Sequence, residues 1–269
     1  MGKIIAICNQ KGGVGKTTTA INLGYYLAQS GKKVLLVDFD PQANATSGLG
    51  VDKSKLEKSI YNVLVNNTGF KEILQEIYLP EFQLMPSSIN LTGAEIELIS
   101  LMNREYRLKN ALKDISPAYD FVLIDSPPSL GLLTINALTA ANSCLIPIQC
   151  EYYALEGLSQ LLNIVNLVRD NLNPDLTIEG MLLTMADYRT NLTSEVIKEA
   201  RSFFKERVFK TIIPRSIRLS EAPGFGKPIH LYDKNSTGAR TYALLAKEIL
   251  GERIEEGEQE WKKEFSVEG

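Results

Sequence analysis

The chain of 269 residues is 44% hydrophobic and 23% charged, an ordinary globular composition that allows one large or two small domains. Its net charge of −3 argues against an overall attraction to nucleic acid, although a local basic surface can still exist. The three cysteines, Cys8, Cys144 and Cys150, have no paired spacing and indicate neither a disulfide framework nor a thiolate metal site.

Short apolar runs alternate with helical patterns along the chain. Runs typical of strands buried on both faces lie at residues 3–8, 33–38, 82–86, 120–125, 143–148, 178–184 and 208–213. Helical spacing lies at residues 17–29, 94–101, 134–141, 154–168 and 193–205. Because strands that alternate with helices pair in parallel, we predict a single-domain α/β fold over residues 1–250, a mostly parallel twisted sheet with helices on both faces. Residues 49–80 are irregular and are expected to lie outside the sheet.

Two further segments are relevant to membrane insertion and to the structure of the C-terminus. Residues 126–150 contain no charged side chain, but Pro127, Pro128 and Pro147 favour a buried helix and strand over a membrane span. Residues 251–269 carry seven acidic and three basic side chains and are expected to form an acidic tail. The first apolar run is too short for a secretory signal, so we predict a cytoplasmic protein that does not contact the membrane.

The stretch NQKGGVGKTTT, residues 9–19, follows the first predicted strand and opens the first predicted helix. Its glycines let backbone N–H groups converge on one anion, which the helix dipole also favours. Lys16 is predicted to contact the β- and γ-phosphates, Thr17 to hold Mg²⁺ and Thr18 to cap the α-phosphate. A usual P-loop has glycine where this chain has Gln10, and Lys11 adds a second cation. The predicted phosphate-binding residues are Lys11, Gly12, Gly13, Val14, Gly15, Lys16, Thr17 and Thr18.

Carboxylates end two further predicted strands, with Asp38 and Asp40 after one and Asp125 after the other. Ligands bind beyond the carboxyl ends of such strands, and the carboxylates would repel each other without a cation. Asp125 is predicted to hold a magnesium-bound water and Asp40 to orient an attacking water. Asp38 either neighbours the magnesium or holds a loop or helix end.

Six ordered stretches within residues 3–250 resemble the ParA/Soj chromosome-partitioning ATPases of the deviant Walker (MinD/ParA) class of P-loop proteins: KGGVGKTTTAINL, VLLVDFDPQANATSGLG, DFVLIDSPPSLGLLTINAL, PIQCEYYALEGLSQL, LLTMADYRTNL and IPRSIRLSEAPGFGKPI. The resemblance implies a slow ATPase with ATP and Mg²⁺ as ligands. It also implies a homodimer formed around ATP, nonspecific binding to double-stranded DNA, a ParB-type partner that stimulates hydrolysis, and association with the nucleoid.

The resemblance also implies residue roles. It implies that Lys11 contacts the nucleotide of the partner subunit across the dimer interface. The expected catalytic residues are therefore Lys11, Lys16 and Asp40. It places Pro214 and Arg215 near the adenine and Glu151 at the dimer interface. Alternatively, Pro214 and Arg215 form an ordinary turn at the end of a strand, and Glu151 is an ordinary surface acid.

Residues 180–230 carry nine basic and five acidic side chains, and a symmetric dimer would double this basic segment for phosphate contacts. Arg189 and Arg218 match arginines that similar Soj proteins need for nonspecific DNA binding. Three further basic residues either contribute to this DNA-binding surface or form an ordinary solvated helix face: Lys198, Arg201 and Lys205.

Three other functions are weighed against this one. A MinD-like membrane ATPase that positions cell division needs a basic amphipathic C-terminal helix, whereas this C-terminus is acidic. An iron protein of the same fold needs paired cysteines for a cluster between subunits. An ATP enzyme that transforms a small acid would need a general base, for which the one histidine, His230, is not convincing.

Overall fold

Seven strands form one sheet in the order β3-β4-β2-β5-β1-β6-β7 in the computed structural model, which describes residues 2–66, 68–151 and 157–254. The strands are β1 (Lys3–Ile7), β2 (Val34–Asp38), β3 (Gln75–Ile77), β4 (Leu79–Met85), β5 (Phe121–Asp125), β6 (Ser143–Gln149) and β7 (Thr177–Thr184). Every pairing is parallel except that of β3 with β4.

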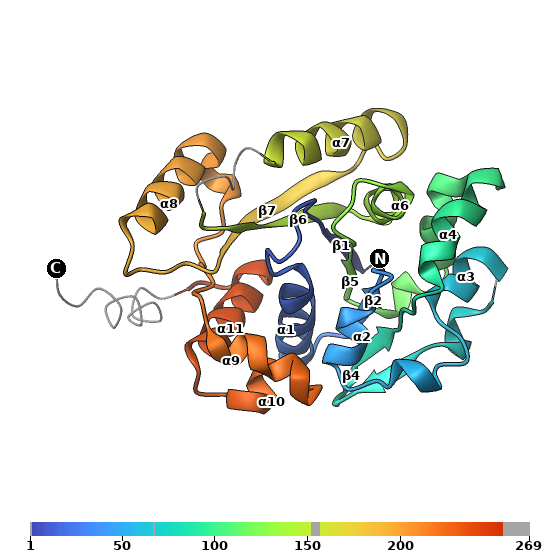
Figure 1. Ribbon diagram of the computed structural model, residues 1–269, viewed down its shortest axis with the longest axis horizontal. Coiled ribbons are helices and arrows are strands. Elements are labelled where there is room, and N and C mark those ends of the chain that lie inside the picture. The colour runs from blue at the N-terminus through green and yellow to red at the C-terminus, as the bar shows by residue number, and fades with distance from the viewer. Residues whose placement is uncertain (1, 67, 152–156, 255–269) are drawn as a thin grey trace.

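Helices cover both faces of the sheet, as predicted, with α1 and α11 on one side and α6 and α7 on the other (Figure 1). The described α-helices are α1 (Lys16–Gln29), α2 (Asn44–Gly48), α3 (Ile60–Asn66), α4 (Leu91–Glu97), α5 (Arg107–Leu112), α6 (Leu132–Ala140), α7 (Leu158–Asn171), α8 (Asn191–Phe204), α9 (Ile217–Glu221), α10 (Ile229–Asp233) and α11 (Thr237–Ile249). Residues 154–156 of one predicted helix lie outside the described residues.

The strands are apolar on both sides because the sheet separates two cores. Ile5 and Ile7 pack in the core beneath α1 and α11, whereas Ala6 and Cys8 pack in the opposite core. This alternation along a fully apolar strand is what a sheet covered on both faces requires. The predicted fold class is therefore confirmed.

The predicted strand at residues 208–213 is wrong. Two isolated bridges, at Met181 with Val208 and at Ala186 with Pro214, join this segment and its end to the chain around β7. One further backbone hydrogen bond runs from the N–H of residue 213 to the carbonyl oxygen of residue 183 at 2.9 Å, but no continuous ladder forms between these described segments. The carboxylate of Glu248 on α11 accepts hydrogen bonds from the backbone N–H groups of residues 210 and 211, at 2.7 and 3.0 Å. Because a distant side chain takes these donors, the segment runs beside β7 without completing a ladder.

The prediction that residues 49–80 lie outside the sheet is wrong for β3 and the first residues of β4. β3 pairs antiparallel with β4 at the sheet edge, and Tyr78 makes the turn between them with a left-handed φ of 56°. The remaining part of this segment contributes α3 and short 3-10 turns, as the irregular pattern indicates.

The uncharged stretch 126–150 divides into α6 and β6, as predicted from its prolines. No helix in the described part of the chain has both the length and the apolar character needed to cross a bilayer. The predicted acidic tail, 251–269, lies outside the described residues from position 255 onward.

Candidate nucleotide-binding site

The loop after β1 has the backbone of an anion-binding turn. Gly13 and Gly15 have left-handed φ values of 74° and 90°, which glycine adopts readily, and α1 begins directly after Gly15. A side chain added at Gly12 or Gly13 would meet no described atom within 4 Å, so this side of the loop is open. The helix N-terminus and the backbone N–H groups are therefore available to a phosphate chain.

Hydrogen bonds to β6 and β7 hold this loop in place. Asn9 donates to the carbonyl oxygen of Pro147 on β6 at 2.7 Å and accepts from the backbone N–H of Lys11 at 3.0 Å. Thr184, at the end of β7, donates to the carbonyl oxygen of Val14 at 2.9 Å. The loop is thus attached to β6, which neighbours β1, and to β7 on the far side of β6. Val14 is buried rather than part of the pocket wall.

A pocket of about 520 Å³ opens beside the loop. Seven predicted site residues line it: Gly12, Gly13, Gly15, Lys16, Thr17, Thr18 and Asp40. The remaining lining residues were not predicted: Gln42, Asn44, Ser47, Gly48, Pro128, Met185 and Pro223.

Lys16 is the positive charge inside this pocket. Its side chain is buried, and its Nζ donates to the carbonyl oxygen of Lys11 at 3.2 Å. Burial lowers the pKa of Lys16, while the nearby carboxylates of Asp125 and Asp40 act in the opposite direction. Such an ammonium group, removed from bulk water, interacts strongly with phosphate oxygens.

Asp125 ends β5 beneath the loop and is fully buried. Its two carboxylate oxygens have no hydrogen-bond partner among the described residues. Burial, followed by the charge of Asp38, raises the pKa of Asp125 well above its usual value, while the nearby Thr17 side chain and the charge of Lys16 act in the opposite direction. A buried carboxylate without a donor is costly, so this arrangement fits a group that faces a cation or its water shell. The residues present therefore fit the implied Mg²⁺.

Asp38 and Asp40 have different surroundings. Asp38 accepts hydrogen bonds from the backbone N–H and the hydroxyl of Thr46, at 2.7 and 2.6 Å. These bonds fix α2 against the end of β2, which favours the loop-holding interpretation of Asp38. Asp40 lines the pocket, where its Oδ1 accepts from the backbone N–H of Gln42 at 2.9 Å.

A second pocket, of about 350 Å³, shares four lining residues with the first: Gly15, Thr18, Met185 and Pro223. Pro214 and Arg215 line it, and the buried Tyr242 closes one side. The hydroxyl of Tyr242 hydrogen-bonds Thr19 of α1 at 3.1 Å, which ties α11 to the helix that follows the phosphate loop. The structure therefore places Pro214 and Arg215 in a pocket next to the phosphate site.

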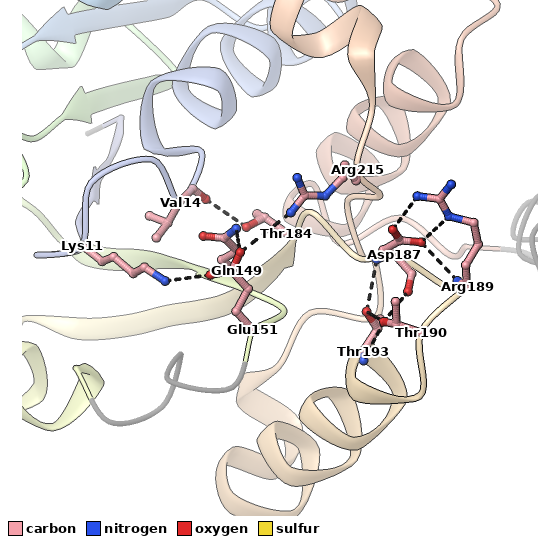
Figure 2. A network of polar contacts seen from close by, with 10 residues as sticks. All are labelled: Lys11, Val14, Gln149, Glu151, Thr184, Asp187, Arg189, Thr190, Thr193 and Arg215. Carbon is pink, nitrogen blue, oxygen red and sulfur yellow. Dashed lines mark hydrogen bonds and ion pairs between the residues drawn. The ribbon is translucent and has the colours of Figure 1, made fainter.

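Lys11 and Glu151, both predicted at the dimer interface, meet within one chain (Figure 2). The Nζ of Lys11 lies 3.1 Å from Oε2 of Glu151, and the two side chains are 43% and 45% exposed. Neither lines the phosphate pocket. Lys11 is thus on the outside of the loop that holds Lys16 on the inside.

A third pocket, of about 420 Å³, is lined by three arginines, Arg189, Arg215 and Arg218, and we call it the arginine pocket. Its other lining residues are Ala186, Asp187, Tyr188, Pro214 and Ile217. Thr190 caps α8 and Ser216 caps α9, and these caps fix the turns that carry the arginines. Arg189 pairs with Asp187 at 2.7 Å and holds the pKa of that carboxyl at about 2. The structure therefore brings together the two predicted DNA-binding residues.

Exposed basic side chains of α8 lie outside the arginine pocket. Lys198 and Arg201 are both exposed, as is Lys205 at the end of the helix, and none of them lines the pocket. This placement fits the alternative of a solvated helix face.

This geometry is that of a P-loop nucleotide-binding protein, in which a helix N-terminus and one lysine receive phosphates at the carboxyl edge of a parallel sheet. A family model described as an AAA domain matches residues 2–178. The chain is 59% identical over 249 residues to the sporulation initiation inhibitor protein Soj of Bacillus subtilis, which covers 93% of this chain and 98% of that protein. The chain belongs to the ParA/Soj family of chromosome-partitioning ATPases, so the resemblance of the six stretches is confirmed.

One further relative agrees with this assignment, and a solved structure of a protein with a different name shares the fold. The chromosome partitioning protein ParA of Myxococcus xanthus is 54% identical over 250 residues, covering 93% of this chain and 88% of that protein. Among solved structures, cobyrinic acid a,c-diamide synthase from Mycobacterium smegmatis with bound ADP and magnesium superposes with a TM-score of 0.82 at 37% identity, covering 98% of this chain and 97% of that one.

The residues weighed for other functions lie away from this site or inside the protein. Cys8, Cys144 and Cys150 are buried, which does not suit ligands of a cluster shared between subunits. His230 stacks on Tyr25 with ring centroids 5.4 Å apart and lines neither nucleotide pocket. The C-terminal segment that a membrane ATPase would use lies mostly outside the described residues.

Proposed function

We propose that this protein is an ATPase that dimerises when it binds ATP, then binds double-stranded DNA without sequence preference and acts in chromosome or plasmid partitioning with a ParB-type partner. The names of its relatives support the partitioning role, and the ADP and magnesium in the solved neighbour support the ligands. In this proposal the protein works in the cytoplasm, on the nucleoid, and does not contact the membrane.

The observation that carries the proposal is the placement of two lysines on opposite sides of one phosphate loop. Lys16 is 6% exposed and lies inside the pocket, whereas Lys11 is on the outer side, where it forms a half-exposed ion pair with Glu151. An exposed ion pair of this kind is weak and is readily exchanged for a phosphate contact. Lys11 is therefore suited to act on a nucleotide held by a second copy.

The roles of this chain's residues follow from their positions. The glycine-rich turn and Lys16 bind the phosphates, and Thr17 with Asp125 would hold Mg²⁺, the latter through water. When bound, Mg²⁺ neutralises charge on the phosphates. Asp40, held by the backbone of Gln42, orients the attacking water, and Lys11 of the partner stabilises charge that develops in the transition state. Pro214 and Arg215 border the nucleoside. Glu151 contributes to the dimer interface.

The proposal is tested by DNA retention with ATP, with ADP and without nucleotide, alongside sedimentation with anionic liposomes. We expect a random duplex to be retained only with ATP and liposomes not to be bound. Retention on liposomes with ATP would instead select the membrane ATPase, and equal DNA retention in all three nucleotide conditions would refute an ATP switch.

A further inference from the structure

Arg215 lies between the two binding regions of this protein. It lines both the pocket that would hold the nucleoside and the arginine pocket. Its backbone N–H donates to the carbonyl oxygen of Ala186 at 3.0 Å, and the neighbouring Pro214 bridges to Ala186, so its main chain is fixed at the end of β7. Its side chain is 57% exposed and lies between Glu151 and Asp187 in Figure 2.

The three guanidinium groups of the arginine pocket differ in how tightly carboxylates hold them. Arg189 donates through both Nε and Nη2 to Asp187, at 2.8 and 2.7 Å, so one bidentate edge of its guanidinium is occupied. Arg218 is 3.0 Å from Glu221 and 3.6 Å from Asp233. A phosphate that binds either arginine must displace or share these partners.

Arg215 is held most loosely of the three. In the described part of the chain its one ion pair is with Glu151, at 3.8 Å, a distance longer than a direct hydrogen bond. Glu151 itself is nearer to Lys11, at 3.1 Å, and also accepts from the side chain of Gln149. Of the three guanidinium groups in the arginine pocket, that of Arg215 therefore gives up the weakest contacts when it binds a new anion.

The surroundings of Arg215 suit a phosphodiester with its sugar. Ile217 lies between Arg215 and Arg218 in sequence, lines the same pocket and is 76% exposed. Pro214 and Ala186 add further apolar surface to the pocket. Guanidinium groups with apolar side chains beside them match the charged and the apolar parts of a nucleic-acid backbone.

We propose that Arg215 is a DNA-binding residue in the arginine pocket, where it contacts a backbone phosphate with Arg189 and Arg218, and that Glu151 competes with this phosphate. This inference rests on the proposed function, since it names a further residue of the same DNA-binding surface. Because Arg215 also borders the nucleoside pocket, the contact lies next to the site where ATP binds.

The test compares Arg215→Ala with wild type in DNA binding across a salt series, with a non-hydrolysable ATP analogue, while the analogue-bound dimer is measured by sedimentation. Because Arg215 also borders the nucleoside pocket, DNA affinities are compared at analogue concentrations at which sedimentation shows both proteins as dimers. Under these conditions we expect the DNA affinity of the Arg215→Ala dimer to fall about tenfold, and the slope of log K against log salt to become shallower by about 0.9 per lost contact. The matched control Arg169→Ala removes one charge from α7, where the side chain is 48% exposed and pairs with Asp170, and should leave the slope unchanged. Unchanged affinity and slope in a dimeric Arg215→Ala variant would overturn the inference.

Glu151→Gln is the second variant, because it leaves Arg215 in place even if Arg215→Ala disturbs nucleotide binding. Removing the competing carboxylate should raise the DNA affinity about two- to fivefold, the range that a weak exposed ion pair allows. The gain should vanish in the double variant with Arg215→Ala. Absence of a gain in the single variant, or its persistence in the double variant, would refute the role of Arg215. Wild type that fails to bind DNA with ATP would instead refute the proposed function.

Discussion

Asp38 and Asp125 lie opposite each other on β2 and β5, and both are fully buried at the carboxyl edge of the sheet. Thr46 donates two hydrogen bonds to Asp38, whereas the oxygens of Asp125 have no partner among the described residues. The surroundings of these two neighbouring carboxylates therefore differ: hydrogen bonds from Thr46 tie Asp38 to α2, whereas Asp125 is buried near Lys16 of the phosphate loop.

The role of Asp38 predicts that Thr46→Val destabilises the protein. The hydroxyl of Thr46 is buried, donates to Asp38 at 2.6 Å and accepts from the backbone N–H of Ser87 at 3.0 Å. Its removal leaves buried polar groups unpaired, so we expect a loss of about 1–3 kcal/mol in the free energy of unfolding, measured with urea. Thr177→Val, which removes an exposed bond to the carbonyl oxygen of residue 142, is the control and should change stability by less than about 0.5 kcal/mol. Equal stability of the two variants would contradict this role.

The position of Lys11 predicts that Lys11→Ala separates ATP binding from dimerisation. The phosphate pocket and Lys16 are unaltered in this variant, so ATP should still bind. ATP-dependent dimerisation in sedimentation should be lost, and hydrolysis should fall by about 10²- to 10³-fold, as for loss of one charge-stabilising group. Lys3→Ala removes an ion pair with Glu179 at the opposite end of β1 and should behave as wild type. A normal ATP dimer of Lys11→Ala would remove this residue from the interface.

Asp40→Ala should dimerise with ATP but hydrolyse it slowly. Asp40 lines the pocket without being part of the phosphate loop, so its loss should spare binding while leaving the attacking water without its orienting group. We expect phosphate release to fall by about 100-fold or more, with sedimentation showing the dimer in the same sample. Wild-type turnover would exclude Asp40 from the chemistry.

Charge reversal in the arginine pocket should abolish DNA binding but not dimerisation. Arg189→Glu combined with Arg218→Glu places two acids in a pocket that a phosphate would otherwise enter, so a random duplex should no longer shift in a gel. The control combines Arg169→Glu on α7 with Arg240→Glu on α11, an equal change of charge outside the pocket. If the pocket variant shifts DNA as well as the control does, the DNA-binding surface lies elsewhere.

The fold was predictable because the central strands are buried on both faces, which leaves continuous apolar runs in the sequence. Residues 208–213 have the same apolar character but do not form a strand, because Glu248 takes two of their backbone donors. No pattern within the segment reveals a partner that lies on α11. β3 was missed because three residues at a sheet edge are too short to show a period.

The phosphate loop was predictable because its chemistry is local, with glycines, lysine and hydroxyls in one stretch between a strand and a helix. The pocket wall formed by Gln42, Asn44 and Met185 was not, because these residues reach the site through tertiary structure. Met185 has a left-handed φ of 52°, a conformation that its residue type does not signal. The arginine pocket likewise combines the starts of α8 and α9, which are joined only in the folded chain.

The central claim is that two copies assemble around ATP, and sedimentation of the wild-type protein tests it most directly. With Mg²⁺ and a non-hydrolysable ATP analogue, we predict a species of twice the 29.9 kDa monomer mass, and with ADP or no nucleotide the monomer alone. A mass that stays the same whether or not the triphosphate is present would contradict the account.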